Sequence, residues 1–180
     1  MPPSKIMLIR HAEKPENEAE GVGAHGRHDD RDLVVRGWQR AGALARFFAP
    51  LHGAASRQGI EPPKRIFAAS GAGGRSKRSH ETATPLAELL GIDIDDSYTT
   101  GDEAALAAAL EADTGAVLVV WEHKAIAAIV DLLTHGEVTA PAWPDDRFDM
   151  VLVLERREGD WRLDQVPQLV LAGDSATPFG

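Results

Sequence analysis

The chain alternates short apolar runs with longer segments in which apolar residues recur at helical spacing. The apolar runs lie at residues 5–9, 65–70 and 116–121. The last of them, AVLVVW, has no polar position, which is typical of a strand buried on both faces of a sheet. The helical patterns lie at residues 36–51, 79–91, 101–115 and 124–136. This alternation predicts a three-layer α/β domain, in which a mainly parallel sheet lies between helices.

The remaining segments predict a hairpin and polar connections. Residues 148–156 and 161–170 are apolar runs on either side of the turn-like sequence Glu158-Gly159-Asp160. The Gly-rich segment 17–32 predicts an exposed flap, and the acidic residues 93–96 predict a solvated turn. We find neither an internal repeat nor a change in composition, and we therefore expect one domain over the whole chain, residues 1–180.

Composition narrows the classes of function. The formal charge of −9, with no basic stripe in the sequence, argues against nucleic-acid binding. The absence of cysteine excludes disulfides, thiolate catalysis and cysteine metal ligands. Only four apolar residues, Ile6 to Ile9, precede the first charged cluster, which is too short for the apolar part of a signal peptide. No run is long enough to span a bilayer, so we expect a cytoplasmic protein without a membrane partner.

Cationic and imidazole side chains follow three of the predicted strands. Arg10 and His11 follow the first, Arg78 follows the second, and Glu122 and His123 follow the third. Because the carboxyl ends of parallel strands share one edge of the sheet, we expect these side chains to meet there. Guanidinium groups bind phosphate oxygens in pairs, and a neutral imidazole can attack phosphorus. The pattern therefore predicts a phosphoryl-binding pocket.

Four segments in order resemble the histidine phosphatase superfamily, the phosphoglycerate-mutase-like group. The family's Arg-His-Gly at the end of strand one appears as Arg10-His11-Ala12. LVVRGWQRA (33–41) resembles the opening of the family's first helix, and IFAASGAGGRSKRSHETATPLAELLG (66–91) resembles the segment with the second phosphate arginine. VLVVWEH (117–123) resembles the strand that delivers the second histidine. The resemblance implies a phosphoglycerate-mutase-like three-layer αβα sandwich and a metal-independent phosphomonoesterase.

The resemblance also implies a mechanism. His11 attacks the phosphoryl group and becomes a phosphohistidine, while Arg10, Arg78 and His123 bind the non-bridging oxygens. A carboxylic acid protonates the leaving oxygen, and water then releases phosphate. The neighbouring arginines should disfavour protonation of His11 and so keep its lone pair available.

Other roles are less closely specified by the resemblance. Either Glu103 or Glu122 is expected to be the proton donor, with Glu103 preferred from its position after the second arginine. Lys14 and Asn17 are expected to contact the phosphate in the place of a serine and an asparagine of the mutase branch. The substrate is expected to be a phosphorylated small molecule or a phosphoprotein.

Departures from the family pattern leave two alternatives. Ala12 replaces the usual glycine, and Glu13-Lys14-Pro15 differs from the mutase sequence. The chain could therefore be a weakly catalytic phosphate- or phosphoprotein-binding regulatory module of the same fold, or a phosphoglycerate-type mutase. We expect no cofactor and no metal, because HGRHDD (25–30) is better interpreted as a polar flap than as a metal site. GAGGRSK (71–77) does not fit a nucleotide-binding loop.

Overall fold

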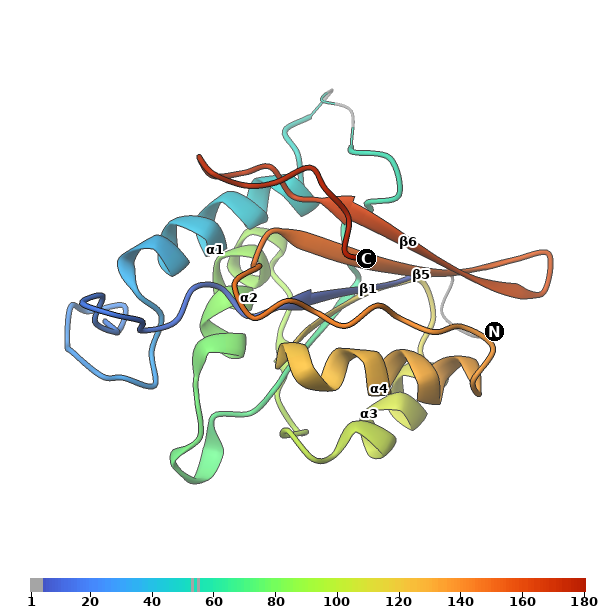
Figure 1. Cartoon of the computed structure of the whole chain (residues 1–180), viewed down its shortest axis with the longest axis horizontal. Coiled ribbons are helices and arrows are strands. Elements are labelled where there is room, and N and C mark those ends of the chain that lie inside the picture. The colour runs from blue at the N-terminus through green and yellow to red at the C-terminus, as the bar shows by residue number, and fades with distance from the viewer. Residues whose placement is uncertain (1–4, 53, 55) are drawn as a thin grey trace.

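A computed structural model describes residues 5–52, 54 and 56–180 (Figure 1). Six strands form one sheet in the order β3-β2-β4-β1-β5-β6. The strands are β1 (Lys5–Arg10), β2 (Arg65–Ala68), β3 (Ile94–Asp95), β4 (Ala116–Trp121), β5 (Met150–Arg157) and β6 (Asp160–Pro167). The helices are α1 (Val35–Phe48), α2 (Arg78–Leu90), α3 (Glu103–Glu111) and α4 (His123–Thr134), with a short 3₁₀ turn η1 (Ala72–Gly74).

The predicted mainly parallel sheet is confirmed. Strand β4 pairs in parallel with β1 on one side and with β2 on the other, and β2 pairs in parallel with β3. Strand β5 runs antiparallel to β1, and β6 runs antiparallel to β5. In this register Arg10 lies opposite Trp121, and Ala68 lies opposite Val120. The carboxyl ends of β1, β4 and β2 therefore lie side by side at one edge of the sheet.

Helices cover both faces of the sheet, as the sequence predicts (Figure 1). The alternation of side chains along β1 sends Ile6 and Leu8 to the face covered by α3 and α4. Met7 and Ile9 point to the opposite face, where α1 and α2 pack. All six residues of β4 are buried, so the valine-rich run is buried on both sides.

The hairpin is also confirmed, and two boundaries are corrected. Glu158 and Gly159 both have positive φ, which gives the two-residue turn whose twist matches a hairpin. Residues 93–96 are not only a solvated turn, because Ile94 and Asp95 form the short edge strand β3 beside β2. The alanine-rich helix occupies residues 103–111 rather than 101–115, since Gly101 and Gly115 adopt the left-handed backbone conformations that interrupt helices.

A buried cation that the sequence analysis did not single out ties the chain after β1 to α1 and to the C-terminal segment. Arg40 on α1 is 2% exposed, and its Nη2 lies 2.9 Å from Glu13 Oε1 and 2.7 Å from Asp174 Oδ1. Its Nη1 donates a hydrogen bond to Gln168 Oε1 at 2.8 Å. Glu13 comes two residues after His11, so this cluster fixes the backbone that leaves the predicted site.

In the residues that the structure describes, no helix is long and apolar enough to cross a membrane.

Replacing Arg40 with methionine should lower the free energy of unfolding by about 3–5 kcal/mol, because the buried carboxylates of Glu13 and Asp174 would lose the buried cation that they share. Urea unfolding followed by circular dichroism measures the change. Arg46→Met on the exposed face of the same helix is the control and should cost less than about 1 kcal/mol. A loss for Arg40→Met no larger than that of the control would contradict this account of the cluster.

Candidate active site

The strand ends bring four predicted side chains together. Arg10 is the last residue of β1 and His11 follows it; His123 begins α4 directly after β4, and Arg78 begins α2. Arg10, His11 and His123 are almost completely buried, and Arg78 is half-buried. The charges of Arg78, Arg10 and His123 all act on the imidazole of His11, so the four groups form one cluster.

The ring of His11 is held in one tautomer. Its Nδ1 lies 2.7 Å from the carbonyl oxygen of Ala12, and a carbonyl can only accept a hydrogen bond. Nδ1 therefore carries the proton and donates it, which leaves the lone pair on Nε2. The backbone N–H of His11 donates to the carbonyl of Trp121 at 3.1 Å, which fixes the residue against β4.

Burial keeps His11 neutral. Removal from water lowers the pKa of His11 to about 3, with further lowering by the positive charges of Arg78 and Arg10 and by His123. The hydrogen bond to the Ala12 carbonyl acts in the opposite direction but does not offset the burial. The expected availability of the His11 lone pair therefore has a physical basis in this cluster.

Three residues of this cluster carry buried donors that have no partner among the described residues. Among the described residues, seven buried side-chain nitrogen and oxygen atoms form no hydrogen bond, and four of them are Arg10 Nε, Arg10 Nη2, Arg78 Nε and His123 Nδ1. Two of the other three are carboxylate oxygens in ion pairs with Lys77 and Arg65. An unsatisfied buried donor costs about 1–3 kcal/mol, and more when it is charged. A cluster that leaves four cationic or imidazole donors unsatisfied is suited to an oxyanion.

The loop before β5 holds one end of the Arg10 guanidinium in place. Nη1 of Arg10 donates to the carbonyls of Asp145 at 2.6 Å and Arg147 at 2.9 Å, and the guanidinium carbon lies 3.8 Å from the centre of the Phe148 ring. These contacts occupy one end of the guanidinium. The other two nitrogens, Nε and Nη2, are buried and form no hydrogen bond with the described residues.

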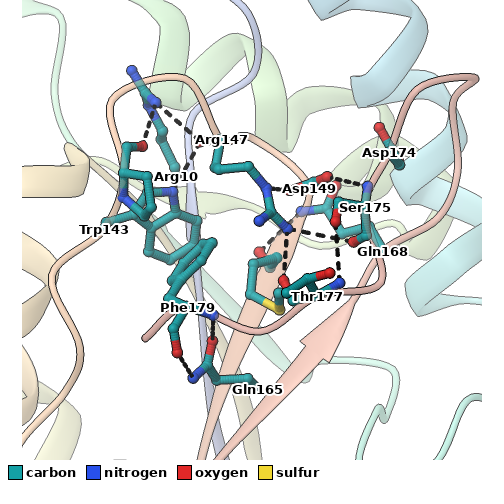
Figure 2. A network of polar contacts seen from close by, with 12 residues as sticks. Arg10, Trp143, Arg147, Asp149, Gln165, Gln168, Asp174, Ser175, Thr177 and Phe179 are labelled. Atoms are coloured by element: carbon teal, nitrogen blue, oxygen red, sulfur yellow. Dashed lines mark hydrogen bonds and ion pairs between the residues drawn. The ribbon is translucent and has the colours of Figure 1, made fainter.

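The C-terminal segment supports that loop (Figure 2). Arg147 Nε donates to Asp149 Oδ1 at 2.6 Å, and the N–H of Ser175 donates to the other carboxylate oxygen of Asp149 at 2.6 Å. Trp143 Nε1 donates to the Arg147 carbonyl at 2.9 Å, and its ring packs edge-on against Phe179 at 5.0 Å. Residues near the end of the chain thus position a side chain at residue 10.

Thr82 is a supporting residue on α2 that the sequence analysis did not assign. Its Oγ1 accepts a hydrogen bond from the N–H of Ala12 at 2.8 Å and donates one to the carbonyl of Arg78 at 2.7 Å. The hydroxyl therefore joins the strand end that carries His11 to the helix start that carries Arg78. In the sequence it belongs to residues 66–91, the segment that resembles the family's segment with the second phosphate arginine. Ala12 does not have a positive φ, so alanine fits this position without backbone strain.

A cavity of about 260 Å³ opens beside His11. It is lined by His11, Ala69, Ser70, Arg75, Ser76, Arg78, Ser79, Thr100 and Glu122. Four of these nine residues carry hydroxyl groups, and Glu122 is the one residue of the lining with a carboxylate. Sequence reasoning missed the serines and threonine, because a hydroxyl residue in a loop carries no sign of the cavity that it will face.

The two candidate proton donors lie in different places. Glu122 lines the cavity, and its Oε1 lies 3.2 Å from His123 Nδ1 without the alignment of a hydrogen bond. Glu103 is not part of the cavity lining. Its carboxylate accepts hydrogen bonds from Trp121 Nε1 at 3.0 Å and from the N–H of Gly101, and these bonds lower its pKa despite partial burial.

Lys14 and Asn17 also lie outside the cavity lining. Lys14 Nζ is 3.4 Å from Glu16, and Asn17 is exposed with a positive φ. Their role as phosphate contacts stays a prediction.

On the flap, His28 Nδ1 lies 2.9 Å from Glu20. Within the part of the chain that the structure describes, no three His, Asp or Glu side chains form a group that could hold a metal ion.

Solved structures share this arrangement of elements, whereas no protein-family model and no curated protein matches the sequence. SixA of Agrobacterium tumefaciens aligns over 91% of this chain and 96% of its own, with TM-score 0.51 and 20% identity. The protein histidine phosphatase SixA complexed with tungstate aligns over 91% and 97%, with TM-score 0.56 and 15% identity. The chain has the histidine phosphatase fold.

A mycobacterial glucosyl-3-phosphoglycerate phosphatase complexed with VO3 has the same fold, with TM-score 0.52, 18% identity and coverage of 89% of this chain and 97% of its own. Two structures with the histidine phosphatase fold thus hold tungstate or vanadate, which are oxyanions like phosphate. The fold that the sequence resemblance implied is confirmed. At these identities the likeness establishes the histidine phosphatase fold, and the chemistry of this chain depends on its own residues.

The imidazole of His11 should stay neutral from pH 8 down to about pH 5, because its pKa is lowered to about 3. NMR of protein labelled with ¹⁵N at histidine should show one protonated and one unprotonated ring nitrogen on His11 over this range. A His11 signal that titrates with a midpoint between pH 6 and 7 would contradict the effect of burial and of the neighbouring arginines.

Proposed function

We propose that this protein hydrolyses phosphate monoesters through a phosphohistidine on Nε2 of His11. The observation that carries the proposal is the set of unsatisfied donors from Arg10, Arg78 and His123 around a neutral imidazole with a defined lone pair. A phosphoryl group supplies three non-bridging oxygens for these donors and an electrophilic phosphorus for Nε2. The oxyanion complexes of structures with the same fold support this proposal.

In the first step the Nε2 lone pair attacks phosphorus, and the bond between phosphorus and the leaving oxygen breaks. The leaving oxygen takes the bonding pair and a proton from the carboxylic acid of Glu122. In the second step water attacks phosphorus, the P–N bond breaks and phosphate leaves. The carboxylate of Glu122 accepts the proton of that water, which returns the site to its starting state.

The donors act chiefly on the charge that develops on the non-bridging oxygens. Arg10 offers its Nε and Nη2 fork, and Arg78 offers Nε from the other wall. Loss of one preorganised donor of this kind typically lowers turnover by about 10²–10³-fold. The hydroxyl-rich cavity beside His11 suits a polar leaving group, from a phosphorylated small molecule or a phosphoprotein.

His11→Ala should reduce hydrolysis of a chromogenic phosphomonoester by at least about 10³-fold, because it removes the nucleophile. The wild type should keep its activity in excess chelator, be inhibited by vanadate, and hold ³²P from labelled substrate after an alkaline quench. His25→Ala on the exposed flap is the matched control and should keep full activity. Phosphate binding without turnover in the wild type would instead indicate a binding module, and activation by a bisphosphorylated compound would indicate a mutase.

Glu122→Gln should affect substrates according to their leaving group. An alkyl phosphate needs a proton on its leaving oxygen, and kcat should fall by about 10²–10⁴-fold. Nitrophenolate leaves without a proton, so kcat for nitrophenyl phosphate should fall by less than about tenfold.

Glu103→Gln is the comparison for this experiment, since Glu103 is bound to Trp121 and Gly101. If the loss that depends on the leaving group appears in Glu103→Gln and not in Glu122→Gln, the proton donor is Glu103.

A further inference from the structure

His123 lies between two different partners. Its Nε2 is 2.6 Å from Oδ1 of Asp145, whereas its Nδ1 is buried and forms no hydrogen bond with the described residues. Glu122, a residue that lines the cavity, approaches Nδ1 to 3.2 Å. Asp145 contacts the other ring nitrogen, and its side chain is 82% exposed to solvent.

The chemistry of these partners fixes where the protons of His123 must be. The hydrogen bond from His123 lowers the pKa of Asp145, and nearby Lys124 acts in the same direction, so Asp145 is an ionised acceptor. Nε2 must therefore carry a proton. A phosphoryl oxygen next to Nδ1 is also an acceptor, so Nδ1 needs a proton as well. An imidazole with both nitrogens protonated is the cation.

We propose that Asp145 is a positioning residue that holds His123 as an imidazolium, so that Nδ1–H binds a phosphoryl oxygen. This inference rests on the proposed function for the identity of the anion. Asp145 also holds Arg10 through its backbone carbonyl at 2.6 Å, so one loop residue orients two of the groups around His11.

Several titratable groups lie close to His123 or to its partner Asp145. Asp145 lies at Nε2 of His123 and Glu122 lies at Nδ1. Arg10 from β1 and Arg78 from α2 are the other cations of the cluster at His11, and Lys124 on α4 acts on Asp145. His11 is neutral and adds no charge. Asp145 makes the short hydrogen bond to Nε2. A single substitution of Asp145 can therefore remove the negative charge next to this ring nitrogen.

The test is Asp145→Asn, with Asp146→Asn as the matched control one residue further along the exposed loop. An asparagine side chain can still accept the hydrogen bond from Nε2, so the substitution removes the charge and keeps the ring in place. The alkaline limb of kcat should move about one pH unit or more toward lower pH in Asp145→Asn. The activity should be close to wild type at pH 5.5 and at least about tenfold lower at pH 8, and Asp146→Asn should follow the wild-type profile.

A loss that is equal at every pH would overturn the proposal, because it would show that Asp145 acts only as a structural support of the loop. A profile identical to wild type would also overturn it. A shift in Asp146→Asn as large as that in Asp145→Asn would do the same, since it would indicate a general effect of loop charge.

A second measurement separates this inference from the proposed function. In the vanadate complex at pH 7.5, ¹⁵N NMR should show both ring nitrogens of His123 protonated in wild type and one in Asp145→Asn, with the signals assigned through His123→Gln. Doubly protonated His123 without turnover would sustain the role of Asp145 and refute the phosphatase. Turnover with a singly protonated His123 would refute the role of Asp145 alone, and a protein that does not bind vanadate would overturn both.

Discussion

The burial of the Arg10 guanidinium at the end of β1 is the constraint on which the rest of the site depends. A cation that is 1% exposed loses most of its hydration, and burial lowers its pKa for that reason. The carbonyls of Asp145 and Arg147 satisfy one end of the group, and the charge of Asp145 acts on it from nearby. The other end has no partner in the described part of the chain. An oxyanion that reaches Nε and Nη2 would stabilise this buried cation further. The other residues of the site are therefore understood by how they hold Arg10 or share the same anion.

The topology of the sheet explains why residues from four parts of the chain meet there. Strand β4 lies between β1 and β2, so the residues that follow these strands are neighbours in space although they are far apart in sequence. The antiparallel addition of β5 then brings the loop before it back across the end of β1. The C-terminal segment supports this loop through Asp149 and Phe179 (Figure 2). The placement of these side chains is therefore a property of the whole sheet edge.

The sequence allowed prediction of the parts of the site that belong to regular elements. Arg10, His11, Arg78 and His123 each adjoin a strand or a helix start, and the pattern of buried strands places such positions at one edge. Arg40 and Thr82 were not assigned, because nothing in a helical pattern distinguishes a buried polar residue from an exposed one before the packing is known. The contact of Asp145 with His123 depends on the path of a loop without periodicity. The choice between Glu103 and Glu122 depends on the direction of two side chains, which spacing along the chain does not determine.

The central claim is that Arg10, Arg78 and His123 bind one oxyanion in front of Nε2 of His11. A crystal structure of the protein with tungstate tests it most directly. We expect tungstate oxygens within about 3.2 Å of Arg10 Nε and Nη2, Arg78 Nε and His123 Nδ1, with the tungsten atom facing Nε2 of His11. Tungstate bound elsewhere, or bound near His11 while these donors contact other groups, would contradict it.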